Sequence, residues 1–168
     1  MPQNKRILLI ISGGIAAYKC LEVVRLLREQ GAAVRCILTK SATEFITPLS
    51  VASLSGDKVY GDLFSLTDEY EMGHIKLSRD ADLIVVVPAT ANILARMAQG
   101  IADDLATTVL LATDKKVMAA PSMNVRMWLN NATQRNINTL KMDGINLIGP
   151  DNGSMACGEY GEGRMSEP

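Results

Sequence analysis

The stretch RILLIISGG, residues 6–14, decides the fold. It is a continuous apolar run that ends in a Ser-Gly-Gly turn, and such runs are typical of strands buried on both faces of a parallel sheet. Residues 15–30 then carry the apolar spacing of a helix and are followed by Gly31, a residue type that commonly ends helices. A buried strand, a glycine turn and a helix together predict the start of a parallel β-α-β unit.

The same alternation continues along the chain. Further strands are predicted at residues 33–39, 82–88, 115–120 and 145–149, and further helices at residues 90–100, 103–113 and about 124–141. Ser41 and Glu44 have the spacing of a capping box and predict another helix start. Residues 48–72 and the glycine-rich region after Pro150 show no clear period. This order predicts an α/β protein, one domain over residues 1–168, with a parallel sheet between two layers of helices.

The composition excludes several classes of protein. The chain has 168 residues, 48% of them hydrophobic and 21% charged, and a net charge of −1, which argues against a nucleic-acid surface and a polybasic membrane contact. The longest apolar runs, residues 7–11 and 83–87, are too short to cross a bilayer. The N-terminal MPQNKR lacks the pattern of a signal peptide, so we expect a cytoplasmic location.

The cysteines and the single histidine restrict the chemistry. Cys20 lies in a helical pattern and Cys36 in a strand pattern, so both are expected to be buried, whereas Cys157 lies among glycines. One histidine and no paired Cys spacing give no zinc pattern, and no metal site is expected.

Ligands of parallel α/β sheets bind outside the carboxyl ends of the strands. Four loops are expected there: residues 12–14, 39–41, 88–92 and 121–124. The first loop could bind one phosphate through its backbone N–H groups at a helix start, because it does not have the G-x-G-x-x-G spacing of a dinucleotide site. Its glycines could equally serve only close packing of the strand against the helix.

Other candidate residues also admit two interpretations. Thr90 and Asn124 each precede a predicted helix, where they could act only as N-caps. His74 could be an ordinary surface or core histidine, or a residue that transfers protons. Cys157 could be a thiol in a disordered tail or part of a loop that closes over a ligand.

Four motifs of this sequence, taken together, indicate a protein family more specifically than any one of them does. SGGIAAYK, PATANI, PSMNVRMW and ACGEYGEGRM, with GHI between the first two, resemble the flavin-containing cysteine decarboxylases from about residue 6 onward. PSMNVRMW fits the P-x-M-N-x-x-M-W signature of that family at every fixed position. PATANI departs from the PASANT motif, with Thr for Ser and Ile at the last place. The ACGEYGEGRM loop is most similar to the branch that serves coenzyme A biosynthesis.

The resemblance implies a fold, a cofactor and a reaction. The fold is a Rossmann-like, three-layer, doubly wound parallel sheet, assembled as homotrimers that bind FMN at subunit interfaces. The substrate is phosphopantothenoylcysteine, which is oxidised at its thiol to a thioaldehyde, loses CO₂ and is reduced again as an enethiol. Some relatives carry a fused synthetase domain, and because this chain stops at GRMSEP, synthetase activity is not expected of it.

The resemblance also assigns residues. His74 is the base, Asn124 orients the substrate carboxylate, and Cys157 donates a proton to the enethiol. Substrate contacts are expected from Met123, Asn124, Ala156 and Cys157. FMN is expected to be bound by Ser12, Gly13, Gly14, Thr39 and Ser41 at its phosphate and by Ala89, Thr90, Ala91 and Asn92 at its ring.

Alternative functions remain open from the sequence. The chain could decarboxylate a peptide C-terminal cysteine, or be a non-catalytic FMN-binding regulatory subunit. Without the resemblance, a hydrolase that uses Cys157 and His74, or an electron carrier similar to flavodoxin, would also be considered. The presence of His74, Asn124 and Cys157 together favours the enzyme.

Overall fold

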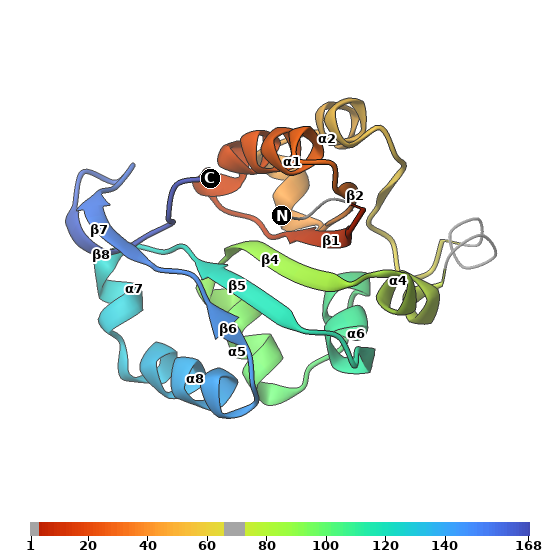
Figure 1. Cartoon of the computed structure of the whole chain (residues 1–168). Helices are drawn as coiled ribbons and strands as arrows, with labels where there is room; N and C mark the ends of the chain where they lie inside the picture. The colour runs from red at the N-terminus through yellow and green to blue at the C-terminus, as the bar shows by residue number, and fades with distance from the viewer. Residues whose placement is uncertain (1–3, 66–72) are drawn as a thin grey trace.

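The computed structural model describes residues 4–65 and 73–168. Its centre is a six-stranded sheet in the order β3-β2-β1-β4-β5-β6, and every neighbouring pair of strands is parallel (Figure 1). The strands are β1 Arg6–Ile11, β2 Ala33–Leu38, β3 Val59–Tyr60, β4 Leu83–Ala89, β5 Val117–Pro121 and β6 Asn146–Leu147. The order reverses between β1 and β4, as in a doubly wound fold. The predicted Rossmann-like parallel sheet in one domain is therefore confirmed.

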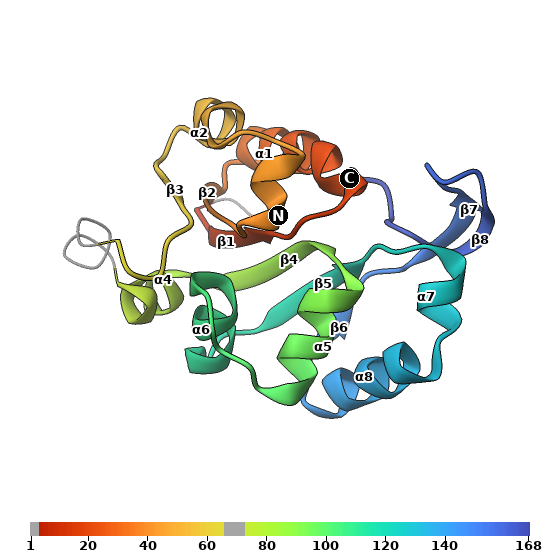
Figure 2. The same cartoon turned by 180° about the vertical axis from the view of Figure 1, so that it is seen from behind.

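Helices cover both faces of the sheet (Figures 1 and 2). The two apolar faces of the sheet form separate cores, one of which includes Ile10 and Ile84 and the other Ile11 and Val24. One face carries α1 and α2, and the other carries α4, α5, α6 and α8. The helices are η1 Ile15–Tyr18, α1 Lys19–Glu29, η2 Ser41–Glu44, α2 Pro48–Ser55, α4 His74–Asp80, α5 Ala91–Gln99, α6 Leu105–Ala112, α7 Val125–Leu129 and α8 Asn131–Met142.

The capping box predicted at Ser41 and Glu44 is wrong. The two residues bound a single 3-10 turn with no side-chain cap, and the helix of this region starts later, at Pro48. Thr47 caps that helix by accepting a hydrogen bond from the Ser50 N–H at 3.1 Å. Proline at the first helical position needs no N–H partner, which fixes the start.

The helix predicted over residues 124–141 consists of two helices. It breaks at Asn130, whose extended backbone ends α7 and whose side chain caps α8 by accepting from the Ala132 N–H at 2.8 Å. Asparagine competes with the backbone for hydrogen bonds, so it favours such a boundary over a helix interior.

The glycine-rich region after Pro150 is an antiparallel hairpin of β7 Asp151–Ser154 and β8 Tyr160–Arg164. It lies beyond the carboxyl ends of β4 and β5, next to α7 (Figure 1). The sequence did not indicate these two strands. Their glycines have no side chains, so the alternation of polar and apolar residues that marks a strand is missing. In residues 4–65 and 73–168, no helix has the length and apolarity needed to cross a bilayer.

Candidate functional site

Two adjoining cavities open at the carboxyl edge of the sheet. The larger, of about 670 Å³, lies between the glycine turn after β1, the start of α5, the loop after β5 and the hairpin. The smaller, of about 380 Å³, lies beside it and has hydroxyl groups in its wall; we call it the hydroxyl cavity. Of the predicted site residues, the large cavity is lined by Gly13, Gly14, Ser41, Thr90, Ala91, Asn92, Met123, Asn124, Ala156 and Cys157. The hydroxyl cavity is lined by Ser12, Thr39, Ser41, Thr90 and Asn92.

The hydroxyl cavity is shaped by hydrogen bonds at the ends of three strands. Ser12, at the end of β1, is 2% exposed, and its Oγ donates to the carbonyl oxygen of Pro88 in β4 at 2.5 Å. The backbone N–H of Thr90 donates back to Ser12 Oγ at 3.2 Å. At the end of β2, the Thr39 and Ser41 hydroxyl oxygens lie 3.2 Å apart. Four hydroxyl oxygens therefore line one small cavity, which is also lined by the cations Lys40 and Arg96 and the carboxylates Glu44 and Asp104.

The first glycine of the turn is needed for packing. A Cβ at Gly13 would lie 2.4 Å from Ser41 Cβ, so any side chain there would push the turn away from the end of β2. The packing interpretation of the turn therefore has direct support. A Cβ at Gly14 would meet only Thr90 Cγ2, at 3.4 Å, so this position faces the cavity with more room. Gly13 thus fits the packing interpretation of the turn, and Gly14 leaves room for the phosphate-binding interpretation.

Of the residues predicted to bind the flavin ring, Ala89 lies away from the large cavity and the other three line it. Thr90 caps α5, as its Oγ1 accepts from the Ile93 N–H at 3.4 Å, and it also lines both cavities with Asn92. Ala89 is fully buried, and in the described structure it lines neither cavity. Its carbonyl oxygen accepts from the Ser122 N–H at 3.0 Å, which holds the next loop in register with β4.

Asn124 caps a helix, as one of its two interpretations predicts, and it also faces the large cavity. Its Oδ1 accepts from the Met127 N–H at 2.8 Å and caps α7, while the residue lines the large cavity. The capping bond uses the acceptor of the amide, and the donor, Nδ2, is the group that a carboxylate ligand requires. Trp128, one turn on, packs against the core and donates its Nε1–H to Glu162 Oε2 at 3.1 Å. Thus α7 is fastened to the hairpin.

Glycines in β8 allow the hairpin to lie directly on the loop after β5. The Met123 N–H donates to the Gly163 carbonyl oxygen at 2.9 Å. Gly163 has φ +123°, and a Cβ there would lie 2.4 Å from the Met123 carbonyl oxygen. A Cβ at Gly161 would lie 2.9 Å from Val125 Cγ2. These close approaches explain Gly161 and Gly163 of the ACGEYGEGRM motif, whereas at Gly158 the positive φ of +84° alone favours glycine.

Cys157 lies in the turn of the hairpin and is exposed. Its Sγ donates to Glu159 Oε2 at 3.8 Å, and the turn is closed by a bond from the Met155 N–H to the Glu159 carbonyl oxygen at 2.8 Å. The turn therefore presents Ala156 and Cys157 to the large cavity from a hydrogen-bonded hairpin.

His74 is the one predicted catalytic residue that a single chain does not bring to this site. It is the first residue of α4, and among the described residues that line the two cavities it is absent. Helix α4 leads into the start of β4, at the opposite end of that strand from the hairpin and α7 (Figures 1 and 2). Met72 of the MGHIKL motif lies outside the described residues.

The other two cysteines are buried, as predicted. Cys20 Sγ donates to the Val87 carbonyl oxygen at 2.9 Å, and burial raises the pKa of its thiol. Burial also raises the pKa of Cys36, to about 12. Both thiols stay protonated at neutral pH, so neither is a nucleophile.

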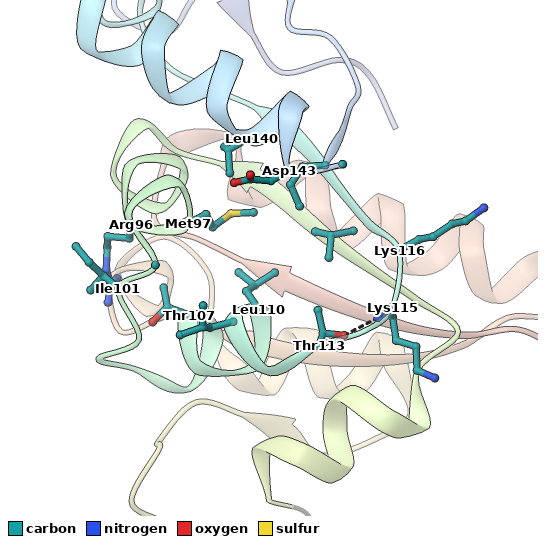
Figure 3. Close-up of a pocket in the computed structure, with 15 residues that line it drawn as sticks. Arg96, Met97, Ile101, Thr107, Leu110, Thr113, Lys115, Lys116, Leu140 and Asp143 are labelled. Carbon is teal, nitrogen blue, oxygen red and sulfur yellow. Dashed lines mark hydrogen bonds between the residues drawn. The ribbon is translucent and has the colours of Figure 1, made fainter.

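A third cavity, of about 270 Å³, lies at the other end of the sheet, between α5, α6 and α8 (Figure 3). Its wall includes Met97, Leu110 and Leu140, with Lys115 and Lys116 at its edge. Its position beside the first residue of β5 is the amino edge of the sheet, where ligands of such folds do not usually bind. None of the predicted site residues lines it.

Two charged residues of the large cavity were not predicted. Lys19 is the first residue of α1, and Arg164 is the last residue of β8. Both belong to motifs that the sequence analysis quoted, SGGIAAYK and ACGEYGEGRM. Their charge was the available signal, but the sequence does not show that the two motifs meet.

The chain is similar to known proteins in both sequence and structure. The coenzyme A biosynthesis bifunctional protein CoaBC of Vibrio parahaemolyticus is 52% identical over 165 residues, which are 98% of this chain and 41% of that protein. This chain thus spans less than half the length of the curated relatives that it matches. The structure of a cysteine-to-serine mutant of PPC decarboxylase, complexed with pantothenoylaminoethenethiol, is 35% identical, with a TM-score of 0.83 over 98% of this chain and 92% of that one.

A second structure, the FMN-dependent cysteine decarboxylase SpaF, is 30% identical, with a TM-score of 0.84 over 96% of this chain and 92% of that one. The Flavoprotein family matches residues 1–168, the full length given. The sheet order, the hydroxyl cavity and the hairpin over the PSMN loop all lie within this match. The chain therefore belongs to the Flavoprotein family.

Proposed function

We propose that the chain is an FMN-dependent decarboxylase that converts phosphopantothenoylcysteine to phosphopantetheine in coenzyme A biosynthesis. The observation that carries the proposal is the meeting of Asn124 and Cys157 on one cavity beside the hydroxyl cavity. The relatives named for coenzyme A biosynthesis and for PPC decarboxylase support this choice of substrate.

The described residues fit FMN. Ser12, Thr39, Ser41 and Thr90 would hold its phosphate in the hydroxyl cavity, and the adjoining large cavity has room for its ring. The α5 N-terminus beside Thr90 adds backbone N–H groups and a favourable dipole for an anion. When bound, FMN would supply the reversible two-electron acceptor, and so the electron sink, that decarboxylation of a cysteine needs.

Asn124 would orient the substrate carboxylate through its Nδ2 group. A neutral amide holds this group with less ground-state stabilisation than a cation would, and the negative charge must leave the carboxylate as CO₂ departs. The capping bond from the Met127 N–H fixes the amide in one orientation, so the donor is positioned before the substrate arrives.

Cys157 would give its proton to the enethiol carbon in the last step. Its position in a closed hairpin turn at the cavity gives access to the substrate, and Glu159, 3.8 Å from its Sγ, is the nearby group that can exchange a proton with it. A cysteine-to-serine mutant of PPC decarboxylase has been solved in complex with pantothenoylaminoethenethiol. An ethenethiol is also the compound that we expect this chain to release when Cys157 is replaced.

His74 would act as the base from a neighbouring copy of the chain, in a homotrimer. In one chain it is the first residue of α4 and lines neither described cavity, so we assign its role in the same reaction to a second copy. Mixing His74→Asn and Cys157→Ser variants tests this. Reassembled mixtures should regain up to about a quarter of the wild-type activity, the fraction of randomly paired sites that contain both intact residues. No recovery after subunit exchange would place His74 outside the shared site.

The wider setting of the domain is also part of the proposal. Residues 1–168 would form the decarboxylase domain, and a fused synthetase domain would be its partner in longer proteins such as the curated relatives. We propose the cytoplasm as its location, because all three cysteines are free thiols, as expected in a reducing compartment.

The first experiment is an absorption spectrum of the purified protein and mass spectrometry of the cofactor that denaturation releases. FMN should be found, and the protein should then release CO₂ from phosphopantothenoylcysteine. Turnover of a peptide with a C-terminal cysteine, but not of phosphopantothenoylcysteine, would show that the peptide is the substrate and that the proposed substrate is wrong. FMN without any turnover would favour a regulatory subunit, and failure to bind added FMN would refute the mechanism.

A further inference from the structure

Two cations converge on one carboxylate at the large cavity. Lys19 Nζ donates to Glu167 Oε1 at 3.0 Å, and Arg164 Nη2 donates to the same oxygen. Lys19 and Arg164 both line the large cavity, whereas Glu167 does not. The two positive groups come from the first residue of α1 and the last residue of β8, which are far apart in the sequence.

The ammonium group of Lys19 is held in place and mostly removed from water. Its side chain is only 10% exposed, while the side chains of Arg164 and Glu167 are 41% and 59% exposed. A buried ammonium group needs partners, and both of its partners are in the segment after β8: the carbonyl oxygen of Met165 at 3.4 Å, and Glu167. The hydrogen bond from Lys19, with the charge of Arg164, lowers the pKa of Glu167.

This cluster carries two positive charges and one negative charge at Glu167. Asp151 is the next acidic group, and it accepts a hydrogen bond from Ser166 Oγ at 2.8 Å. A carboxylate on an exposed side chain is a replaceable partner for a buried lysine. A phosphate matches the pair better, because it carries up to two negative charges and can accept from both the ammonium group and the planar guanidinium group.

The cofactor phosphate has a different place. The hydroxyl cavity, where we place it, is lined by neither Lys19 nor Arg164. The large cavity holds Asn124 and Cys157, which act on the cysteine end of the substrate. A substrate with a phosphate at its other end needs a second anion site on this same cavity.

We propose that Lys19 and Arg164 bind the phosphate of phosphopantothenoylcysteine, and that Glu167 holds this site until the substrate replaces it. The inference depends on the proposed function, which it deepens by assigning residues that select the phosphorylated substrate. Lys19 and Arg164 would raise the affinity for the substrate without taking part in the chemical steps. Glu167 would compete with the substrate for both cations.

The test compares phosphopantothenoylcysteine with pantothenoylcysteine, which lacks the phosphate, for the wild type and its variants. Lys19→Gln should raise KM for the phosphorylated substrate by about 10- to 100-fold, the effect of losing one charge-assisted hydrogen bond, and leave KM for the other within about 2-fold. Arg164→Gln should act in the same direction, and Lys19→Arg should retain the preference. Glu167→Gln should lower KM for the phosphorylated substrate.

Lys115→Gln and Glu29→Gln are the matched controls, since these residues lie away from the large cavity and should leave both KM values unchanged. Bound flavin is measured for each variant from its absorbance. An equal loss with both substrates would overturn the inference and assign Lys19 a structural role. Loss of flavin in Lys19→Gln would overturn it by assigning this residue to the cofactor. A wild type that turns over neither substrate would refute the proposed function itself.

Discussion

The backbone N–H of Met123 donates to the carbonyl oxygen of Gly163, 2.9 Å away, and this bond attaches the last strand of the chain to the loop after β5. The contact joins two motifs that lie about forty residues apart in the sequence. Because the bond is between backbone atoms, neither side chain reveals it. Glycine at position 163 is what makes the approach possible, since a Cβ there would lie 2.4 Å from the Met123 carbonyl oxygen.

Replacing Gly163 should therefore lower the free energy of unfolding by more than its positive φ alone explains. Gly163→Ala should lower the free energy of unfolding by more than Gly144→Ala, because Gly144 also has a positive φ, +88°, but a Cβ there meets nothing within 4 Å. The control should cost about 1–2 kcal/mol. Urea unfolding of both variants gives the comparison. Equal losses would show that the hairpin moves away from Met123 at little cost.

The roles of Asn124 as a cap and as a ligand can be separated. Asn124→Asp keeps an oxygen for the Met127 N–H but removes the amide donor, so it should retain the stability of α7 and lose decarboxylation. Asn124→Ala should lose both, with a stability cost of about 1 kcal/mol. Thermal unfolding and CO₂ release are the two measurements.

Asn130 provides the matched control, because it caps α8 in the same way through the Ala132 N–H and lines neither the large nor the hydroxyl cavity. Asn130→Asp and Asn130→Ala should reproduce the stability changes and leave turnover intact. If Asn124→Asp decarboxylates at the wild-type rate, the amide donor has no part in the reaction.

Cys157→Ser should still release CO₂ but stop at the enethiol, because a hydroxyl is a much weaker acid than a thiol. Mass spectrometry of the reaction products measures this. Asn152→Ala, an exposed change on the preceding strand of the hairpin, should give complete turnover. Normal yields of the reduced product from Cys157→Ser would remove this residue from the mechanism.

Thiol labelling should distinguish the three cysteines of the native protein. Iodoacetamide at neutral pH should modify Cys157 alone, because it is exposed, whereas burial protects Cys20 and Cys36 and raises the pKa of both. The expected result is one adduct per chain in intact-mass spectra, rising to three after denaturation. Rapid modification of a second cysteine would contradict the packing of α1 and β2 described above.

The ion pair at the start of β1 and β4 should make stability depend on pH. Arg6 donates to Asp82 from its side chain and its backbone N–H, and these bonds lower the pKa of Asp82 to about 2. A pKa below the unfolded value of about 4 means that this stabilisation is fully present above about pH 4 and is lost as the pH falls through about 2.

Asp82→Asn should therefore be less stable than the wild type at pH 7, and the difference in free energy of unfolding should disappear between about pH 4 and pH 2. Asp114→Asn is the control, because its side chain is 84% exposed. A difference that stays constant over this range would show that the Asp82 carboxylate does not titrate with the pair.

Much of the fold could be predicted from the sequence, because buried parallel strands give continuous apolar runs such as residues 7–11 and 83–87. The hairpin could not, since its strands are held by backbone bonds and its glycines carry no pattern of apolar residues. The break at Asn130 was missed because the apolar spacing runs through it.

The candidate site, like the fold, could be predicted from the sequence only in part. Asn124 and Cys157 were assigned through family motifs, and the structure places both on one cavity. Lys19 and Arg164 were not identified, because their importance arises from the meeting of two motifs at opposite ends of the chain. That His74 lines neither described cavity could not be foreseen either, because a motif does not show which residues meet in the folded chain.

The position of the hairpin also has a consequence for the order in which the molecule is made. All six strands of the central sheet precede residue 148, so the sheet can form before the hairpin leaves the ribosome. The large cavity needs residues from both. A nascent or proteolytically trimmed chain that lacks residues 151–165 could therefore retain a folded sheet and its hydroxyl cavity, yet lack one wall of the large cavity.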